Sequence, residues 1–112
     1  MTETPTPAIQ LRTLERTLEK ALHELRAMCS STELAMGDAD QTMGDRWAAL
    51  HRLQEQSVVI LSRVVPLVER VPMSYRGYPA YRECLRLSVQ LKREALAAQR
   101  LHRDHAQQMG LG

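Results

Sequence analysis

Apolar residues recur along the first third of the chain at alternating spacings of three and four. This heptad spacing keeps one face of a helix against a neighbouring helix. It predicts a helix over residues 8–29, packed along its whole length. Residues 1–7 contain two prolines and three threonines, and we expect them to form a flexible tail. The predicted seam consists of Leu11, Leu14, Leu18, Ala21, Leu25 and Met28.

Acidic residues and glycines follow this helix. Residues 33–45 contain no basic residue, and Gly37 and Gly44 interrupt the helical pattern. We therefore expect residues 30–44 to be an acidic connector that is partly helical at most. Residues 30–33, Ser-Ser-Thr-Glu, also suit a capping box, which would start a short new helix or turn there.

A second helix is predicted over residues 45–71, with Asp45 as its N-cap. Val59 and Ile60 are apolar residues that lie outside the one apolar face expected for this helix. This surplus indicates a helix that is buried all round or that carries a dimer interface. The run 58–68 would also suit a strand, but no second strand is available to pair with it. The expected apolar face consists of Trp47, Leu50, Leu53, Val58, Leu61, Val64, Val65 and Val68.

Prolines mark the end of this region. Pro66 should kink the second helix or end it early. Pro79 suits the first turn of a third helix, over residues 79–108, after a loop at 72–79. Helices of these lengths exceed the width of a compact domain. The sequence therefore predicts an all-α fold: a single domain over residues 8–109, built as an elongated antiparallel bundle of three long helices with coiled-coil-like packing.

Composition narrows the classes of protein further. The chain has no Phe, so its core must be mainly aliphatic, and a net charge of +2 argues against nucleic-acid binding by the whole surface. Cys29 and Cys84 are not in a Cys-x-x-Cys unit, which excludes a zinc site made of cysteines alone. We expect two reduced, buried thiols in a cytoplasmic protein. The alternative is a disulfide between them, which would require their two helices to run side by side. The N-terminus does not resemble a Sec-type signal peptide, and no apolar stretch is long enough to span a membrane.

Two segments resemble metal sites superficially. His102 and His105 share one helix face, but no third ligand is evident. Residues 38–44 resemble the start of a calcium loop, yet Met43 stands where glycine is needed and Ala49 where the bidentate glutamate is needed. We expect no metal and no cofactor. The chain also has no glycine-rich phosphate loop, nucleophile elbow or paired catalytic carboxylates, so we do not expect an enzyme.

Residues 73–82 contain every tyrosine of the chain, interleaved with two arginines. Tyrosine and arginine dominate the energetics of protein interfaces. One alternative is that the tyrosines only fix the loop over the end of the bundle. A third and less favoured interpretation is that they stack on nucleic-acid bases. The candidate partner-binding residues in this segment are Tyr75, Arg76, Tyr78, Tyr81 and Arg82.

Arginines also recur along the third helix. Arg86 and Arg93 follow Arg82 at spacings of four and seven, and Arg100 follows at seven. Such a face suits an acidic protein or a phosphate backbone, or simply solvent.

We expect a non-enzymatic protein–protein interaction module of the adaptor, chaperone or inhibitor type. It would bind a larger protein and form a homodimer through Val59 and Ile60. The alternatives are a nucleic-acid-binding protein that uses the arginines of the third helix and a purely structural, self-assembling coiled coil. Nucleic acid is the less favoured partner, and no membrane interaction is expected.

Overall fold

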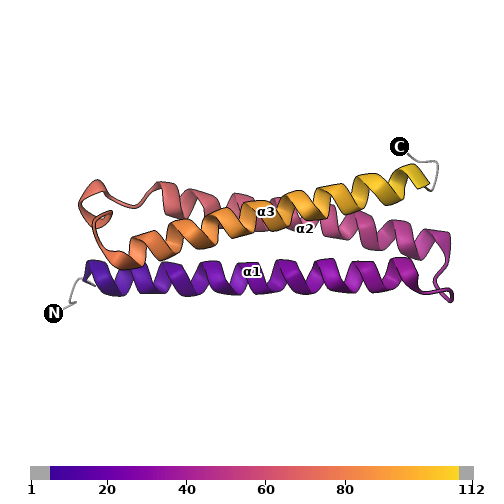
Figure 1. Cartoon of the computed structure of the whole chain (residues 1–112), viewed down its shortest axis with the longest axis horizontal. Coiled ribbons are helices and arrows are strands. Elements are labelled where there is room, and N and C mark those ends of the chain that lie inside the picture. The colour runs from indigo at the N-terminus through magenta and orange to yellow at the C-terminus, as the bar shows by residue number, and fades with distance from the viewer. Residues whose placement is uncertain (1–5, 109–112) are drawn as a thin grey trace.

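Three long helices make up the bundle in the computed structural model, which describes residues 6–108. They are α1 (Pro7–Gly37), α2 (Met43–Glu69) and α3 (Pro79–Gln108), with a short 3₁₀ turn, η1 (Met73–Tyr75), before α3. α2 runs antiparallel to α1 and α3, and each helix packs against both others (Figure 1). The radius of gyration is 17.6 Å, against about 13 Å for a compact domain of this length. The predicted elongated all-α bundle is confirmed.

The N-terminal end of α1 is capped by a side chain. The Thr6 hydroxyl accepts a hydrogen bond from the backbone N–H of Ile9 at 3.3 Å. Pro7 follows at the first helical position, where its missing N–H has no helical partner to lose. Residues 1–5 of the expected tail lie outside the described residues, as does the expected domain end at residue 109.

The first helix is longer than expected. The predicted end near Cys29 and the capping box at residues 30–33 are both wrong, because α1 continues to Gly37. Thr32 is buried in this extension, and its hydroxyl donates to the carbonyl oxygen of Met28 at 2.8 Å. A threonine bonded to the carbonyl four residues earlier lies inside a helix and does not start one. The connector between α1 and α2 is therefore limited to residues 38–42.

The start of α2 also differs from the prediction. Thr42, not Asp45, is the N-cap: its hydroxyl accepts the N–H of Asp45 at 3.0 Å, and the Asp45 carboxylate accepts the N–H of Thr42 at 3.4 Å. This is a complete capping box. The connector is held by Asp38, whose carboxylate accepts from the N–H of Asp40 and whose carbonyl accepts from Arg46.

The buried face of α2 is shifted from the expected one. Ile60 is only 3% exposed and packs in the core, whereas Val58 is 53% exposed. Ser57 is fully buried in a seam position, and its hydroxyl donates to the carbonyl oxygen of Gln54 at 2.8 Å. The expectations that Val58 lies in the core and that Ile60 is free for self-association are therefore wrong. The seam of α2 consists of Leu50, Leu53, Ser57, Ile60, Val64 and Val68.

Pro66, which was expected to kink α2 or end it early, lies near the end of this helix. α2 ends at Glu69, two residues before the expected end, with Pro66 inside its last turn. Proline has no N–H, so the helical bond to the carbonyl of Ser62 is missing. Loss of that bond weakens only the last turn, and the Arg70 N–H still bonds to the Pro66 carbonyl at 3.0 Å. Within residues 6–108, no helix is both long and apolar enough to cross a membrane.

The core lies along the line where the three helices meet. Its side chains are small or aliphatic, and the spacings of three and four recur in each helix. α1 contributes Leu18, Ala21, Leu22, Leu25 and Cys29, and α3 contributes Cys84, Leu87, Leu91, Ala95 and Ala98.

Truncating a side chain at the centre of this core should destabilise the fold strongly. Leu91 is completely buried in α3, so Leu91→Ala removes packed methyl groups and leaves a cavity. We expect the free energy of unfolding to fall by about 2–5 kcal/mol. Leu34→Ala is the matched control, because Leu34 is 76% exposed and its loss should cost less than about 0.5 kcal/mol. Chemical denaturation of both variants measures the difference, and equal losses would contradict this description of the core.

Candidate protein interface

The candidate residues rich in tyrosine and arginine lie together at one end of the bundle, in the turn between α2 and α3 (Figure 1). The turn is closed by its own backbone. The N–H groups of Tyr75, Arg76 and Tyr78 each donate to the carbonyl three residues earlier, at 2.9–3.2 Å. These bonds hold the turn in one conformation before anything binds to it.

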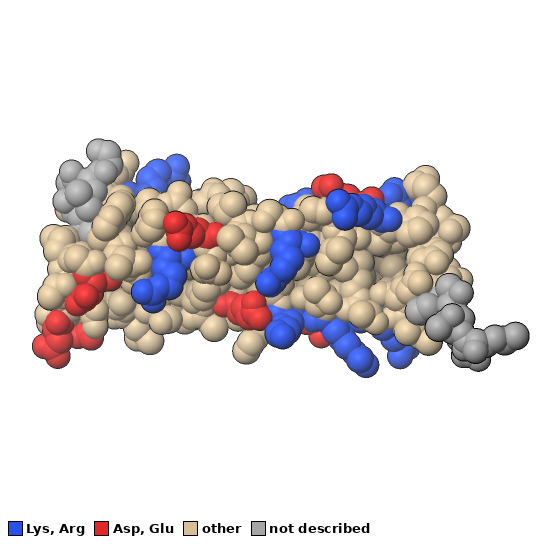
Figure 2. Space-filling view, turned by 180° about the vertical axis from the view of Figure 1, so that it is seen from behind, with Lys and Arg blue, Asp and Glu red and all other residues tan. Residues whose placement is uncertain are grey.

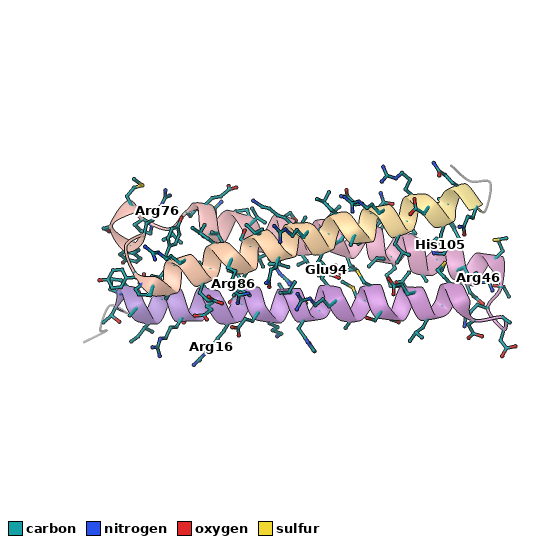
Figure 3. The ribbon with its side chains drawn as sticks, viewed as in Figure 1. Arg16, Arg46, Arg76, Arg86, Glu94 and His105 are labelled. Atoms are coloured by element: carbon teal, nitrogen blue, oxygen red, sulfur yellow. The ribbon has the colours of Figure 1, made fainter. Side chains whose placement is uncertain are left out.

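Arg76 stabilises this turn from within. Its Nη2 atom donates to the carbonyl oxygen of Val71 at 3.4 Å, and its Cζ atom lies 5.8 Å from the ring centre of Tyr81. A guanidinium over a tyrosine ring is attracted by the negative face of the ring. Figure 3 shows Arg76 at the end of the bundle where this turn joins α2 to α3. Arg76 and Tyr81 therefore connect the two sides of the turn, as the alternative interpretation of the tyrosines expected.

Other side chains of the turn face outward. Met73 is 76% exposed and Tyr78 is 40% exposed, while Arg82 is exposed in the first turn of α3. Tyr75 is half-buried and lines an apolar groove between α1 and α2. We call Met73, Tyr78 and this groove the turn-end surface. The groove is lined by Leu11, Leu14, Leu67, Val71, Pro72 and Tyr75, with Gln10, Thr13, Thr17 and Arg70 beside them.

The groove and Met73 were not singled out from the sequence. Leu14 and Leu67 lie far apart in the chain, and each looks like an ordinary apolar position of its own helix. Leu67 is 40% exposed. The available signal was Leu67 itself, an apolar residue between Pro66 and Val68 that does not fit the spacing of the core seam.

Arg82, Arg93 and Arg100 are exposed along one side of α3, whereas a neighbouring carboxylate engages Arg86. Arg86 forms an ion pair with Glu83 one turn earlier, beside the groove between α1 and α3 (Figure 3). The hydrogen bond from Arg86 lowers the pKa of the Glu83 carboxyl and raises that of the guanidinium. Arg93 is exposed and forms no ion pair among the described residues. Arg86 is thus partly neutralised, while Arg93 is open to a partner.

Val59 is exposed, as self-association through it would require. Val59 is 48% exposed and Val58, beside it, is 53% exposed. Both line a shallow hollow on α2 together with His51, Gln54 and Glu55. Within the apolar run at residues 58–61, the exposed pair is therefore Val58 and Val59, not Val59 and Ile60.

Trp47 and the histidines pack at the end of the bundle opposite the turn. The ring centre of His102 lies 5.5 Å from that of Trp47. The ring of His51 stacks on Trp47 as well, with the ring centres 6.3 Å apart. His102 Nε2 is buried without a hydrogen-bond partner. Across residues 6–108, no three His, Cys, Asp or Glu side chains are grouped closely enough to share a metal ion. The ring of His102 thus packs against Trp47.

The two cysteines are free and lie at different levels of the bundle. The Cys84 thiol donates to the carbonyl of Leu11 at 3.5 Å, whereas Cys29 lies eighteen residues further along α1, or about 27 Å at 1.5 Å per residue. This separation excludes a disulfide between them within one chain. Burial raises the pKa of each thiol from 9.0 to about 11, with smaller contributions from Glu94 at Cys29 and Glu15 at Cys84.

Both thiols should be unreactive in the folded protein. A thiol reagent attacks the thiolate, which is scarce at about pH 8 when the pKa is raised by burial. We expect slow modification of Cys29 and Cys84 in the native protein and fast modification of both in denaturant, followed by mass spectrometry. Fast modification of either cysteine under native conditions would contradict its burial.

The same shift makes stability depend on pH. The folded pKa exceeds the unfolded value of 9.0. The stabilisation from neutral thiols is therefore complete below pH 9 and is lost as the pH rises through 9 toward 11.

No protein-family model matches the chain, and no curated protein and no solved structure matches it either. The function must therefore be argued from the chain's own surfaces.

Proposed function

We propose that this protein is a non-enzymatic interaction module of the adaptor, chaperone or inhibitor type, which binds a larger protein through its turn-end surface. One observation carries the proposal: Met73 and Tyr78 are exposed on a closed turn beside an apolar groove. A thioether and an aromatic ring offer adaptable apolar contact area, which is typical of protein-binding surfaces.

The rigidity of the turn favours binding. Backbone hydrogen bonds and the contact between Arg76 and Tyr81 already order the segment. Binding then costs little conformational entropy, because the turn does not have to be ordered by its partner. Tyr78 also has only two side-chain torsions to fix, so it loses less freedom than a long flexible side chain would.

Charge around the turn indicates the chemistry of the partner. Residues 67–82 contain three arginines, Arg70, Arg76 and Arg82, and a single carboxylate, Glu69. Acidic side chains gather instead at the opposite end of the bundle, where α1 meets α2 (Figure 2). We infer a partner surface whose apolar side chains are flanked by acidic ones. We also place the protein in the cytoplasm, where two unpaired thiols stay reduced.

A photocrosslinking residue placed at Met73 should capture the partner. We would introduce it at Met73 and, as a control, at Leu34. Both side chains are 76% exposed, and they lie at opposite ends of the bundle. After irradiation in the source cell, we expect one protein adduct at Met73 that is absent at Leu34, identified by mass spectrometry.

A second variant tests the chemistry of that contact. Tyr78→Ala should lower the yield of the Met73 adduct while leaving the thermal unfolding midpoint nearly unchanged, because Tyr78 is exposed. The same adducts at Met73 and Leu34, or no adduct at either, would contradict the proposed function.

A further inference from the structure

A second heptad seam runs along the outside of α2 and α3. On α3, positions 85, 89, 92 and 96 follow one another at spacings of four, three and four, as a helix-packing seam does. Positions 54, 58, 61 and 65 repeat that spacing on α2. We call these residues the outer seam. Its most exposed apolar members, 41–53% exposed, are Val58, Leu85, Val89 and Leu96, and the others are Gln54, Leu61, Val65 and Lys92.

These two halves of the outer seam lie on the same face of the bundle. Gln54 of α2 borders one hollow together with Leu96 of α3 and a second hollow together with Val58. The Trp47 and His102 rings, 5.5 Å apart, set the register between the two antiparallel helices. Eight residues further along α2, Glu55 therefore lies level with position 94 of α3. The outer seam is thus one continuous strip across α2 and α3.

The edges of this face carry opposite charges. Arg82, Arg93 and Arg100 are exposed along the α3 edge, and none of them has an ion pair among residues 6–108. Glu55 and Glu69 are exposed along the α2 edge, and the Glu55 carboxylate also lies 3.0 Å from Nε2 of His51. By the register above, Arg93 lies nearly level with Glu55, and Arg82 lies within two residues of the level of Glu69. The face is therefore complementary in charge to itself once it is rotated.

We propose that the outer seam is the interface of a homodimer whose two-fold axis runs along the length of the bundle. That rotation places α3 of one copy over α2 of the other at the same level. Arg93 then meets the partner's Glu55, and Arg82 meets the partner's Glu69. A two-fold axis across the bundle would instead place α3 on α3 and arginine on arginine, which like-charge repulsion disfavours.

The size of the face is sufficient for a stable dimer. α3 has 30 residues, and two adjacent helices about 20 Å wide over about 45 Å give a face of roughly 900 Å². Standard interfaces bury about 800 Å² per partner. The four facing helices form an antiparallel arrangement in which every neighbour runs in the opposite direction, as in four-helix bundles. Lys92, a single charge in the seam, weakens the contact and specifies its register.

The dimer would also present two turn-end surfaces at the same end of the assembly. Two binding surfaces side by side allow a partner with two matching sites to bind with higher avidity. This consequence goes beyond the proposed function, which concerns the turn-end surface of one copy, and the two can fail separately.

Charge exchange across the seam tests the inference. We would measure the dissociation constant of the full chain by light scattering on a sizing column and by analytical ultracentrifugation, from low to high micromolar concentration. Arg93→Glu or Glu55→Arg alone turns two attractive pairs into two repulsive ones, and should weaken the dimer by roughly ten-fold or more. The double variant Arg93→Glu/Glu55→Arg should recover most of the loss.

One further variant is a control, and two more test the seam itself. Arg16→Glu should leave the dissociation constant unchanged, because Arg16 points away from the bundle on α1 (Figure 3). Lys92→Leu should tighten the dimer, since it removes the charge from the seam. Val89→Glu should abolish the dimer without unfolding the chain, because Val89 is 46% exposed and glutamate is a good helix former.

Spin labels distinguish the two orientations of the two-fold axis. Ser74 is exposed in the turn, and with Cys29 and Cys84 buried, Ser74→Cys gives one labelling site. A short distance between the two labels is expected, whereas a distance near the full length of the bundle would overturn the proposed axis. A monomer at every concentration, or a dimer insensitive to the Val89, Arg93 and Glu55 variants, would overturn the interface. Neither result would affect a Met73 adduct, which tests the proposed function by itself.

Discussion

Three helices packed side by side share only one narrow line of interior, and that limit governs the rest of this molecule. Each helix can bury about two positions per heptad there. The side chains that fill it are mainly leucine, valine, isoleucine, alanine and cysteine, with Ser57 and Ser88 buried among them. Any further apolar residue has to lie on a surface. The chain carries more apolar residues than this line accommodates. Its outer seam and its groove at the turn end hold part of this excess, so these surfaces follow from the geometry of the core.

Much of the fold could be predicted because heptad spacing is a strong signal over long helices. The failures come from hydroxyl side chains. Ser57 occupies a seam position of α2, and because it is polar, the apolar pattern around it pointed to Val58 in its place. The sequence at residues 30–33 suggested a new helix start, although Thr32 among them is buried inside α1. Both hydroxyls donate to a carbonyl of their own helix, so burial costs them no hydrogen bond. A pattern of apolar letters cannot distinguish such a residue from a capping or turn residue.

The candidate interface could be predicted in part, for a different physical reason. The turn rich in tyrosine and arginine is contiguous in sequence, so composition alone located it. The groove beside it could not be found in that way, because Leu14 and Leu67 meet only after α1 and α2 have packed. The arginines of α3 show a third limit. Helical spacing fixes where the Cα atom of Arg86 lies, but Glu83 decides where its long side chain points.

The bond between the Cys84 thiol and the Leu11 carbonyl joins residues 73 positions apart in the chain. α1 and α3 run in the same direction, so no short turn can join them, and the chain returns between them through α2. Loop closure over that distance is slow compared with the pairing of helices that are adjacent in sequence. A two-helix intermediate would leave one side of its seam open to water, so it gains little until the third helix arrives. Folding should therefore be a single cooperative event in which all three helices pack together.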